Sequence, residues 1–103
     1  MLVCTAGNVQ AEVSADEFLR SPSKEMKEQY LRAFYNAVSW YKAYIVTVEK
    51  GTGAYCAPGN LALTGPQLLQ ILNSYVEAHP NARLDPVGMA MFQSLIRAFP
   101  CKQ

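Results

Sequence analysis

The sequence predicts an all-α fold, a small bundle of about four helices of which one is long. Three observations favour this prediction. Apolar residues recur at steps of three or four, capping residues and prolines mark the expected helix starts, and no stretch alternates with period two for long enough to indicate a sheet. The length of 103 residues and the hydrophobic share of 50% suit one folded domain, which we expect to span residues 12–103.

Two helices are expected in the first half of the chain. Ser14 and Glu17 have the spacing of a capping box, which opens a short helix that ends at Leu19. Ser21 then provides an N-cap, and Pro22 occupies the first position of the long helix.

The long helix is expected to continue without a break to Lys50, where Gly51 follows as a C-terminal glycine. One row of its apolar residues is suited to a core: Tyr30, Phe34, Val38, Tyr41, Ile45 and Val48. Others fall partly off that row: Leu31, Tyr35, Trp40 and Tyr44. The apolar surface is wider than one packing partner needs, which suggests a second contact such as an oligomer, although wide aromatic helices also occur in ordinary bundles.

Two shorter helices, 65–79 and 86–99, are expected after a connector rich in Gly, Pro and Asn. Thr64 is a candidate cap for the first, and Asp85 followed by Pro86 repeats the cap-plus-proline start for the second. Their apolar faces are Leu68, Leu69, Leu72, Tyr75 and Val76, and then Met89, Phe92, Leu95, Ile96 and Phe99.

Three cysteines, Cys4, Cys56 and Cys101, raise the question of pairing. Two helices joined by a short turn form an αα-hairpin and bring their far ends together, so we predict a disulfide between Cys56 and Cys101. Such a bridge would contribute about 4 kcal/mol on the chain-entropy model. The alternative is a pair of buried, unpaired thiols.

The N-terminal residues 1–11 are expected to be the remnant of an export signal. Met1 to Cys4 is apolar, and Val9-Gln10-Ala11 has small residues where signal peptidase accepts them. The expected compartment is then the periplasm, and a disordered cytosolic N-terminus is the alternative.

Charge and composition exclude several classes of function. Nine basic and eight acidic residues give a net charge of +1 without a polybasic block, so we expect no nucleic-acid binding. The sequence lacks a run of about 18 apolar residues, so we expect no membrane insertion. Because His79 is the only histidine and no Cys-x-x-Cys pair occurs, we expect no metal site, and no cofactor is predicted.

Catalytic residues are not predicted either. His79 stands at a helix C-terminus before a proline, where an imidazole caps the last carbonyls. A dyad of Cys56 and His79 is conceivable, but the disulfide is the better use of Cys56.

Residues 55–101 carry an ordered set of motifs: Tyr55-Cys56-Ala57-Pro58-Gly59, Gln67-Leu68, Tyr75-Val76-Glu77-Ala78-His79-Pro80, Arg83, and Ala98-Phe99-Pro100-Cys101. In this order and spacing they resemble the Tai-type immunity proteins. Ala43-Tyr44-Ile45 falls where that family often has Gly-Tyr-Ile. Many members carry a further cysteine pair in the N-terminal half, where this chain has only Cys4.

The resemblance implies a small helical periplasmic protein, often a homodimer, that binds a toxin delivered by a type VI secretion system. The toxin is typically a peptidoglycan amidase of the cysteine-peptidase kind, and its active site is blocked sterically without chemistry by the inhibitor. The alternative function is a small periplasmic chaperone of the acid-stress type, which would protect clients from aggregation at low pH.

The turn between the last two helices is the expected contact surface, through His79, Asn81, Arg83 and Asp85. A rigid, protruding polar turn can plug a cleft. These residues could equally be only caps and turn formers, and the connector from Gly51 to Asn60 is a competing surface.

Overall fold

The computed structural model describes residues 13–48, 53–57 and 63–101. Its elements are, in chain order, α1 (Ala15–Arg20), α2 (Lys24–Thr47), α3 (Gly65–Ala78), the 3-10 helix η2 (Pro80–Leu84) and α4 (Val87–Ala98). Within these ranges the only extended pairing is a single bridge between Ser14 and Pro86, and the all-α prediction is confirmed. The predicted export segment 1–11, Gly51 and part of the connector lie outside the described residues.

The first helix is capped as the sequence predicts. The Ser14 hydroxyl oxygen accepts a hydrogen bond from the Glu17 backbone N–H at 3.1 Å, which satisfies one of the free donors of the first turn. Phe18 of α1 is 4% exposed, and its ring lies 5.3 Å from that of Tyr30, centroid to centroid. This aromatic contact joins α1 to α2.

The predicted start of α2 is wrong by two residues. Ser23 rather than Ser21 is the N-cap, and its hydroxyl oxygen accepts a hydrogen bond from the Met26 N–H at 3.1 Å. Ser21 instead ends α1, because its own N–H donates to the Phe18 carbonyl at 3.2 Å. Pro22 therefore lies in the link between the two helices.

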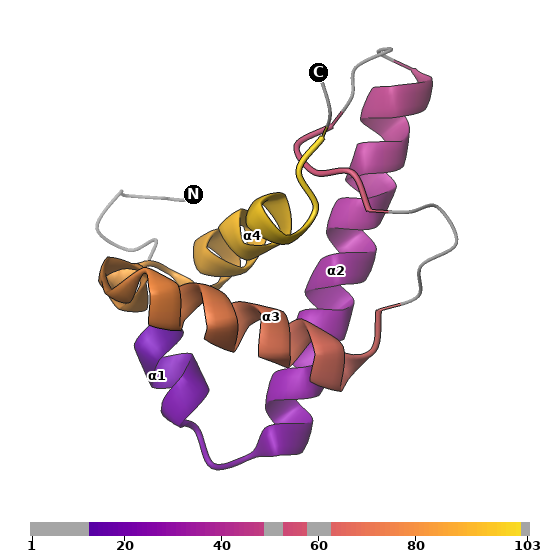
Figure 1. Cartoon of the computed structure of the whole chain (residues 1–103). Coiled ribbons are helices and arrows are strands. Elements are labelled where there is room, and N and C mark those ends of the chain that lie inside the picture. The colour runs from indigo at the N-terminus through magenta and orange to yellow at the C-terminus, as the bar shows by residue number, and fades with distance from the viewer. Residues whose placement is uncertain (1–12, 49–52, 58–62, 102–103) are drawn as a thin grey trace, which may run out of the picture.

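Helix α2 packs against the core through its residues up to Val38. Leu31 is fully buried, and it is the single residue of α2 in the buried class. Tyr41 and Val48, which the periodicity assigns to a core row, are 66% and 57% exposed. That part of the prediction is wrong because α3 crosses α2 near one end, and the other end extends past α3 and α4 (Figure 1).

The core lies between α3, α4 and the N-terminal elements. Its members are almost completely shielded from solvent: Ala15, Phe18, Leu31, Tyr55, Leu68, Leu72, Val76, Ala82, Val87, Ala90, Met91 and Leu95. Ser94 is the one polar side chain among the buried residues described, and its hydroxyl donates to the Ala90 carbonyl at 2.6 Å. The apolar row predicted for α3 is confirmed, since Leu68, Leu72 and Val76 are buried.

The start of α3 combines a full capping box with a close helix contact. The Gln67 N–H donates to the Thr64 hydroxyl at 3.3 Å, and the Thr64 N–H donates to Gln67 Oε1 at 2.9 Å. A Cβ built on Gly65 would lie 2.7 Å from the Cβ of Glu28 and 3.3 Å from its carbonyl oxygen. Glycine is therefore needed where α3 meets α2.

The predicted cap of α4 by Asp85 is not what the structure shows. Pro86 is the N-cap and makes no side-chain capping bond, and the Asp85 carbonyl accepts instead from the Ala15 N–H at 2.8 Å. The Val87 N–H donates to the Val13 carbonyl at 3.0 Å. The start of α4 is thus fixed by a short extended pairing with the chain before α1.

Cys56 and Cys101 form the predicted disulfide, with Cα atoms 4.9 Å apart. The bridge joins the segment before α3 to the segment after α4, so it closes the part of the chain that contains both helices. A backbone hydrogen bond from the Cys56 N–H to the Phe99 carbonyl, at 2.8 Å, supports the same contact.

The segment 53–57 packs against α2 and α4 through Tyr55, which is 2% exposed. Its ring lies 6.4 Å from the ring of Tyr35 and 6.3 Å from that of Phe92, in an edge arrangement with the latter. The Lys42 ammonium lies 5.5 Å from the centre of the Tyr55 ring. Burial raises the pKa of Tyr55, and the neighbouring Ser39 hydroxyl opposes this effect.

Candidate functional site

The turn that the sequence predicts as a contact surface follows α3 directly. The backbone N–H of His79, the C-cap of α3, donates to the Tyr75 carbonyl at 2.9 Å. The imidazole Nδ1 lies 3.2 Å from the same oxygen, and the ring stacks on Tyr75 with centroids 4.6 Å apart. The capping role predicted for His79 is confirmed.

Backbone hydrogen bonds hold the turn in one conformation. The Ala82 N–H donates to the His79 carbonyl at 2.8 Å, and the Asp85 N–H donates to the Ala82 carbonyl at 3.1 Å. Ala82 itself is 5% exposed and belongs to the core, so its side chain holds the turn against the rest of the domain. Because Asp85 also pairs with Ala15, the turn and α1 form one unit.

The four predicted contact residues lie together on this turn but differ in exposure. Asn81 and Arg83 are exposed, whereas His79 and Asp85 are half-buried. Arg83 Nη1 lies 3.7 Å from Asp16 Oδ1, and the Arg83 side chain still keeps 46% of its surface exposed. This pair fixes the direction of Arg83 without removing it from solvent.

Leu84, the last residue of η2, is the feature of the turn that sequence reasoning missed. Its side chain is 82% exposed, more than any other large hydrophobic residue described. The sequence predicts a polar turn here, and the signal that points to Leu84 is its apolar side chain between Arg83 and Asp85. A single exposed leucine is ordinary, but one at the end of a rigid turn is a suitable anchor for a partner cleft.

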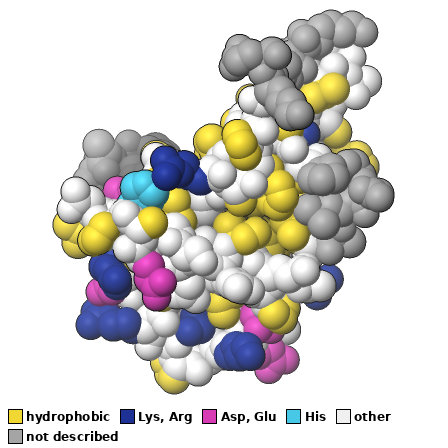
Figure 2. Space-filling model, viewed as in Figure 1, with side chains coloured by type: hydrophobic (Ala, Val, Ile, Leu, Met, Phe, Trp, Pro, Cys, Tyr) yellow, Lys and Arg dark blue, Asp and Glu magenta, His cyan; other side chains and the backbone are white. Residues whose placement is uncertain are grey.

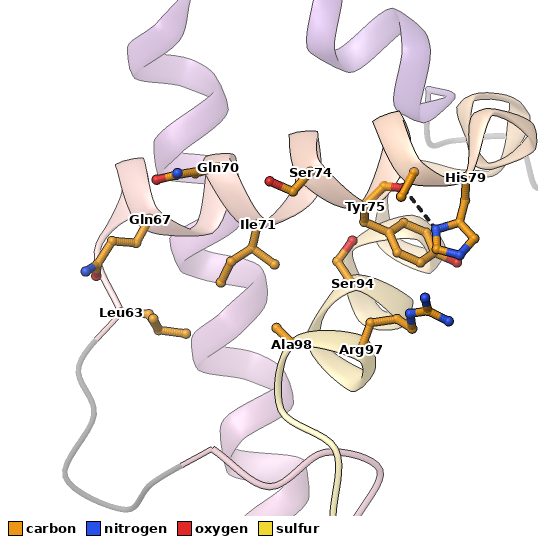
Figure 3. A pocket seen from close by; sticks show the side chains of 11 residues that line it. Leu63, Gln67, Gln70, Ile71, Ser74, Tyr75, His79, Ser94, Arg97 and Ala98 are labelled. Atoms are coloured by element: carbon orange, nitrogen blue, oxygen red, sulfur yellow. Dashed lines mark hydrogen bonds between the residues drawn. The ribbon is translucent and has the colours of Figure 1, made fainter.

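A groove of about 490 Å³ lies between α3 and α4, beside the turn. Its lining residues come from both helices and the segments next to them: Leu63, Gln67, Gln70, Ile71, Ser74, Tyr75, Ala78, His79, Ser94, Arg97 and Ala98. Leu63, Ile71 and Ala98 lie toward one end, and Arg97 lies beside the stacked rings of Tyr75 and His79 at the other (Figure 3). Figure 2 shows hydrophobic side chains gathered on this face, with the histidine and a basic side chain next to each other.

A second apolar surface, which we call the distal surface, lies on the half of α2 that extends past the core. Trp40, Tyr41, Tyr44 and Val48 are 77%, 66%, 50% and 57% exposed. At 3.6 residues per turn these four positions fall within an arc of about 100°. The sequence suggests a second contact on this helix, and these four side chains are among its exposed apolar residues.

The described part of the chain bears on two chemistries considered from the sequence, a dyad of cysteine and histidine and a metal site. Both Cys56 and Cys101 are in the disulfide, so a dyad of Cys56 with His79 has no thiol. Within residues 13–48, 53–57 and 63–101 no group of three or more His, Cys, Asp or Glu side chains could hold a metal ion. None of the helices in the same ranges has the length and hydropathy needed to cross a bilayer.

Comparison with known proteins gives one family match. The profile of the Rap1a immunity proteins matches residues 2–101, nearly the whole chain. No curated protein and no solved structure matches this chain.

Proposed function

We propose a mode of action from one premise, that this chain belongs to the Rap1a immunity proteins. It is therefore a non-enzymatic protein that neutralises an amidase effector of a type VI secretion system. In our proposal neutralisation is steric: the turn formed by His79, η2 and Asp85 enters the active-site cleft of the toxin. Leu84 is the apolar anchor, and His79, Asn81, Arg83 and Asp85 make the polar contacts around it.

The observation that carries this proposal is a rigid turn that ends in an exposed apolar side chain. Leu84 is 82% exposed, while Ala82 two residues earlier is 5% exposed. Binding loses less conformational entropy when the contact segment is already ordered. The ion pair of Arg83 with Asp16 and the backbone hydrogen bonds of the turn provide that order.

The test is a pull-down from a producing strain with the full chain, followed by mass spectrometry and an assay of the captured amidase. We expect wild type to inhibit it and Leu84→Asp to weaken inhibition at least about 100-fold, as for a central anchor. Met89→Asp is the matched control, because Met89 is also an exposed apolar side chain, 52% exposed, but lies on α4. Equal inhibition by wild type and Leu84→Asp would place the contact elsewhere. Recovery of unfolded clients after acid treatment, and of no amidase, would favour the chaperone function instead.

We also propose that the protein acts in the periplasm as a single domain, residues 12–103, after export directed by a signal of which residues 1–11 are the remnant. The disulfide supports this location, since such bridges persist in oxidising compartments and are rare in the cytosol. A peptidoglycan amidase has its substrate there. Fractionation of a producing strain, with the mass of the mature chain, tests both the location and the cleavage site.

The Tai-type resemblance supports a finer assignment within the family. We propose that the toxin is an amidase of the cysteine-peptidase kind, on the strength of the ordered motifs between Tyr55 and Cys101. Reaction of the captured toxin with a thiol-directed reagent, and its protection by the immunity protein, would support this assignment. Full amidase activity after alkylation would contradict it.

We propose further that the protein is a homodimer that pairs through the distal surface. Its four side chains offer about 500 Å² of apolar area, a large part of the roughly 800 Å² that each partner of a stable interface buries. Lys42 is the only charged residue between positions 37 and 48, and its ammonium lies over Tyr55. A second copy would therefore meet a neutral surface without like-charge repulsion.

Size-exclusion chromatography with light scattering tests the dimer. We expect a dimer for wild type and a monomer for Trp40→Glu, because a carboxylate cannot be buried unpaired in an apolar contact. Val46→Glu is the matched control, since Val46 is 44% exposed on the opposite side of the same helix. A monomeric wild type at high concentration would refute the proposal.

A further inference from the structure

We propose that the groove between α3 and α4 binds a segment of the toxin that carries an acidic side chain beside an apolar one, with Arg97 as the pairing cation. This inference rests on the proposed function and specifies the chemistry of the partner. The groove adjoins the turn. Tyr75 and His79 line the groove, and they also line a neighbouring hollow that is formed by Asn81 and other residues of the turn. A toxin that contacts the turn at Asn81 and Asp85 would therefore also reach the edge of the groove.

The apolar lining at one end of the groove predicts that the bound segment carries an apolar side chain. Leu63, Ile71 and Ala98 converge there, and two of them, Leu63 and Ile71, are half-buried members of the layer around the core. A volume of about 490 Å³ falls within the range of roughly 300–1,000 Å³ of pockets that hold compact ligands. The site is an open groove, which suits a chain segment that enters from the side.

The positive charge of Arg97 at the other end predicts that the bound segment also carries an acidic side chain. Among the described residues that line the groove, Arg97 is the only one with a full charge. Helix α4 contains no Asp or Glu, and the one acidic residue of α3, Glu77, is outside the lining. Among the ion pairs of the described residues, none includes Arg97.

The polar side chains of the groove that are buried or half-buried already have partners. The Tyr75 hydroxyl donates to Gln93 Oε1 at 2.9 Å, the Ser94 hydroxyl donates to Ala90, and the His79 ring is held against the Tyr75 carbonyl. The Arg97 guanidinium therefore remains as the charged donor. A guanidinium pairs with a carboxylate through two parallel hydrogen bonds, which gives direction as well as attraction.

The test measures binding of the amidase captured by wild type to variants of the full chain. Arg97→Glu should weaken binding at least about 30-fold, because it places like charges together in a desolvated contact. Arg32→Glu is the matched control, since Arg32 is an exposed arginine on α2 that does not line the groove, and it should change binding less than about threefold. Ala98→Trp fills the apolar end at an exposed position and should weaken binding without any change of charge.

Each outcome decides the question. If wild type captures and inhibits the amidase but Arg97→Glu and Ala98→Trp bind it as wild type does, the groove inference is overturned and the proposed function stands. If wild type captures no amidase, both are overturned. If the variants abolish the dimer and leave toxin binding intact, the occupant is a second copy, which also overturns the inference. Circular dichroism of each variant confirms that the fold is retained.

Discussion

Removal of the disulfide provides the most direct measure of how this small domain is stabilised. The variant carries Cys56→Ser and Cys101→Ser, which together open a covalent loop with a sequence separation of 45 residues. On the chain-entropy model such a loop contributes about 4 kcal/mol to the free energy of unfolding. For a domain of this size that is a large fraction of a total of roughly 5–15 kcal/mol.

The structure indicates that little offsets this loss. The hydrogen bond from Cys56 to the Phe99 carbonyl remains possible without the bridge, but a single backbone bond contributes only about 1 kcal/mol net. At about 4–8 °C per kcal/mol, the midpoint of thermal unfolding should fall by about 15–30 °C.

Urea unfolding at equilibrium, followed by far-UV circular dichroism, measures the change in free energy directly. Cys4→Ser is the control, because it makes the same thiol-to-hydroxyl change and leaves the bridge of Cys56 and Cys101 intact. A loss below about 1 kcal/mol would refute the reasoning, since it would mean that the unfolded chain keeps the two segments together without the bond.

Three further substitutions test single contacts by the same urea assay. Gly65→Ala should destabilise the fold by about 1–3 kcal/mol, because the new methyl group overlaps Glu28, and unchanged stability would show that the helices separate at no cost. Thr64→Ala should cost about 1 kcal/mol through loss of the cap to Gln67, and a loss near zero would mean that water replaces it. Tyr55→Phe should not destabilise at neutral pH, because the Tyr55 hydroxyl is buried without a well-formed hydrogen bond among the described residues, and a loss above about 1 kcal/mol would contradict this. The raised pKa of Tyr55 favours its neutral form in the fold, so its contribution is complete below about pH 10 and is lost as the pH rises toward the folded-state pKa, a decline that Tyr55→Phe should lack.

The helix caps and the disulfide could be predicted from the sequence, because they depend on residues that are close along the chain or on a simple helical hairpin. Thr64 caps α3, and His79 caps its other end, as Pro66 in the first turn and Pro80 after the last turn indicate. The disulfide was also predictable, because an αα-hairpin determines where Cys56 and Cys101 meet. The start of α2 was not predictable in this way, because Ser21 ends α1 and the cap passes to Ser23, a second serine two residues later.

Features that depend on the crossing of helices were not predictable in this way. The periodicity of α2 is nearly the same along its length, yet Leu31 is buried and Tyr41 is 66% exposed. The difference arises because α3 meets α2 close to Gly65, and no pattern within α2 records that position. Leu84 was missed for a similar reason: its exposure follows from the packing of Ala82 beneath the turn.

The extension of α2 past the core also separates two kinds of selection on this protein. Trp40 and Tyr44 are 77% and 50% exposed, so substitutions there cost little in folding and can change how two copies pair. Substitutions at Leu31 or Gly65 lower the free energy of unfolding, so stability limits which residues these positions accept. The distal surface can therefore vary in how two copies pair while the folded framework that presents the turn stays constant.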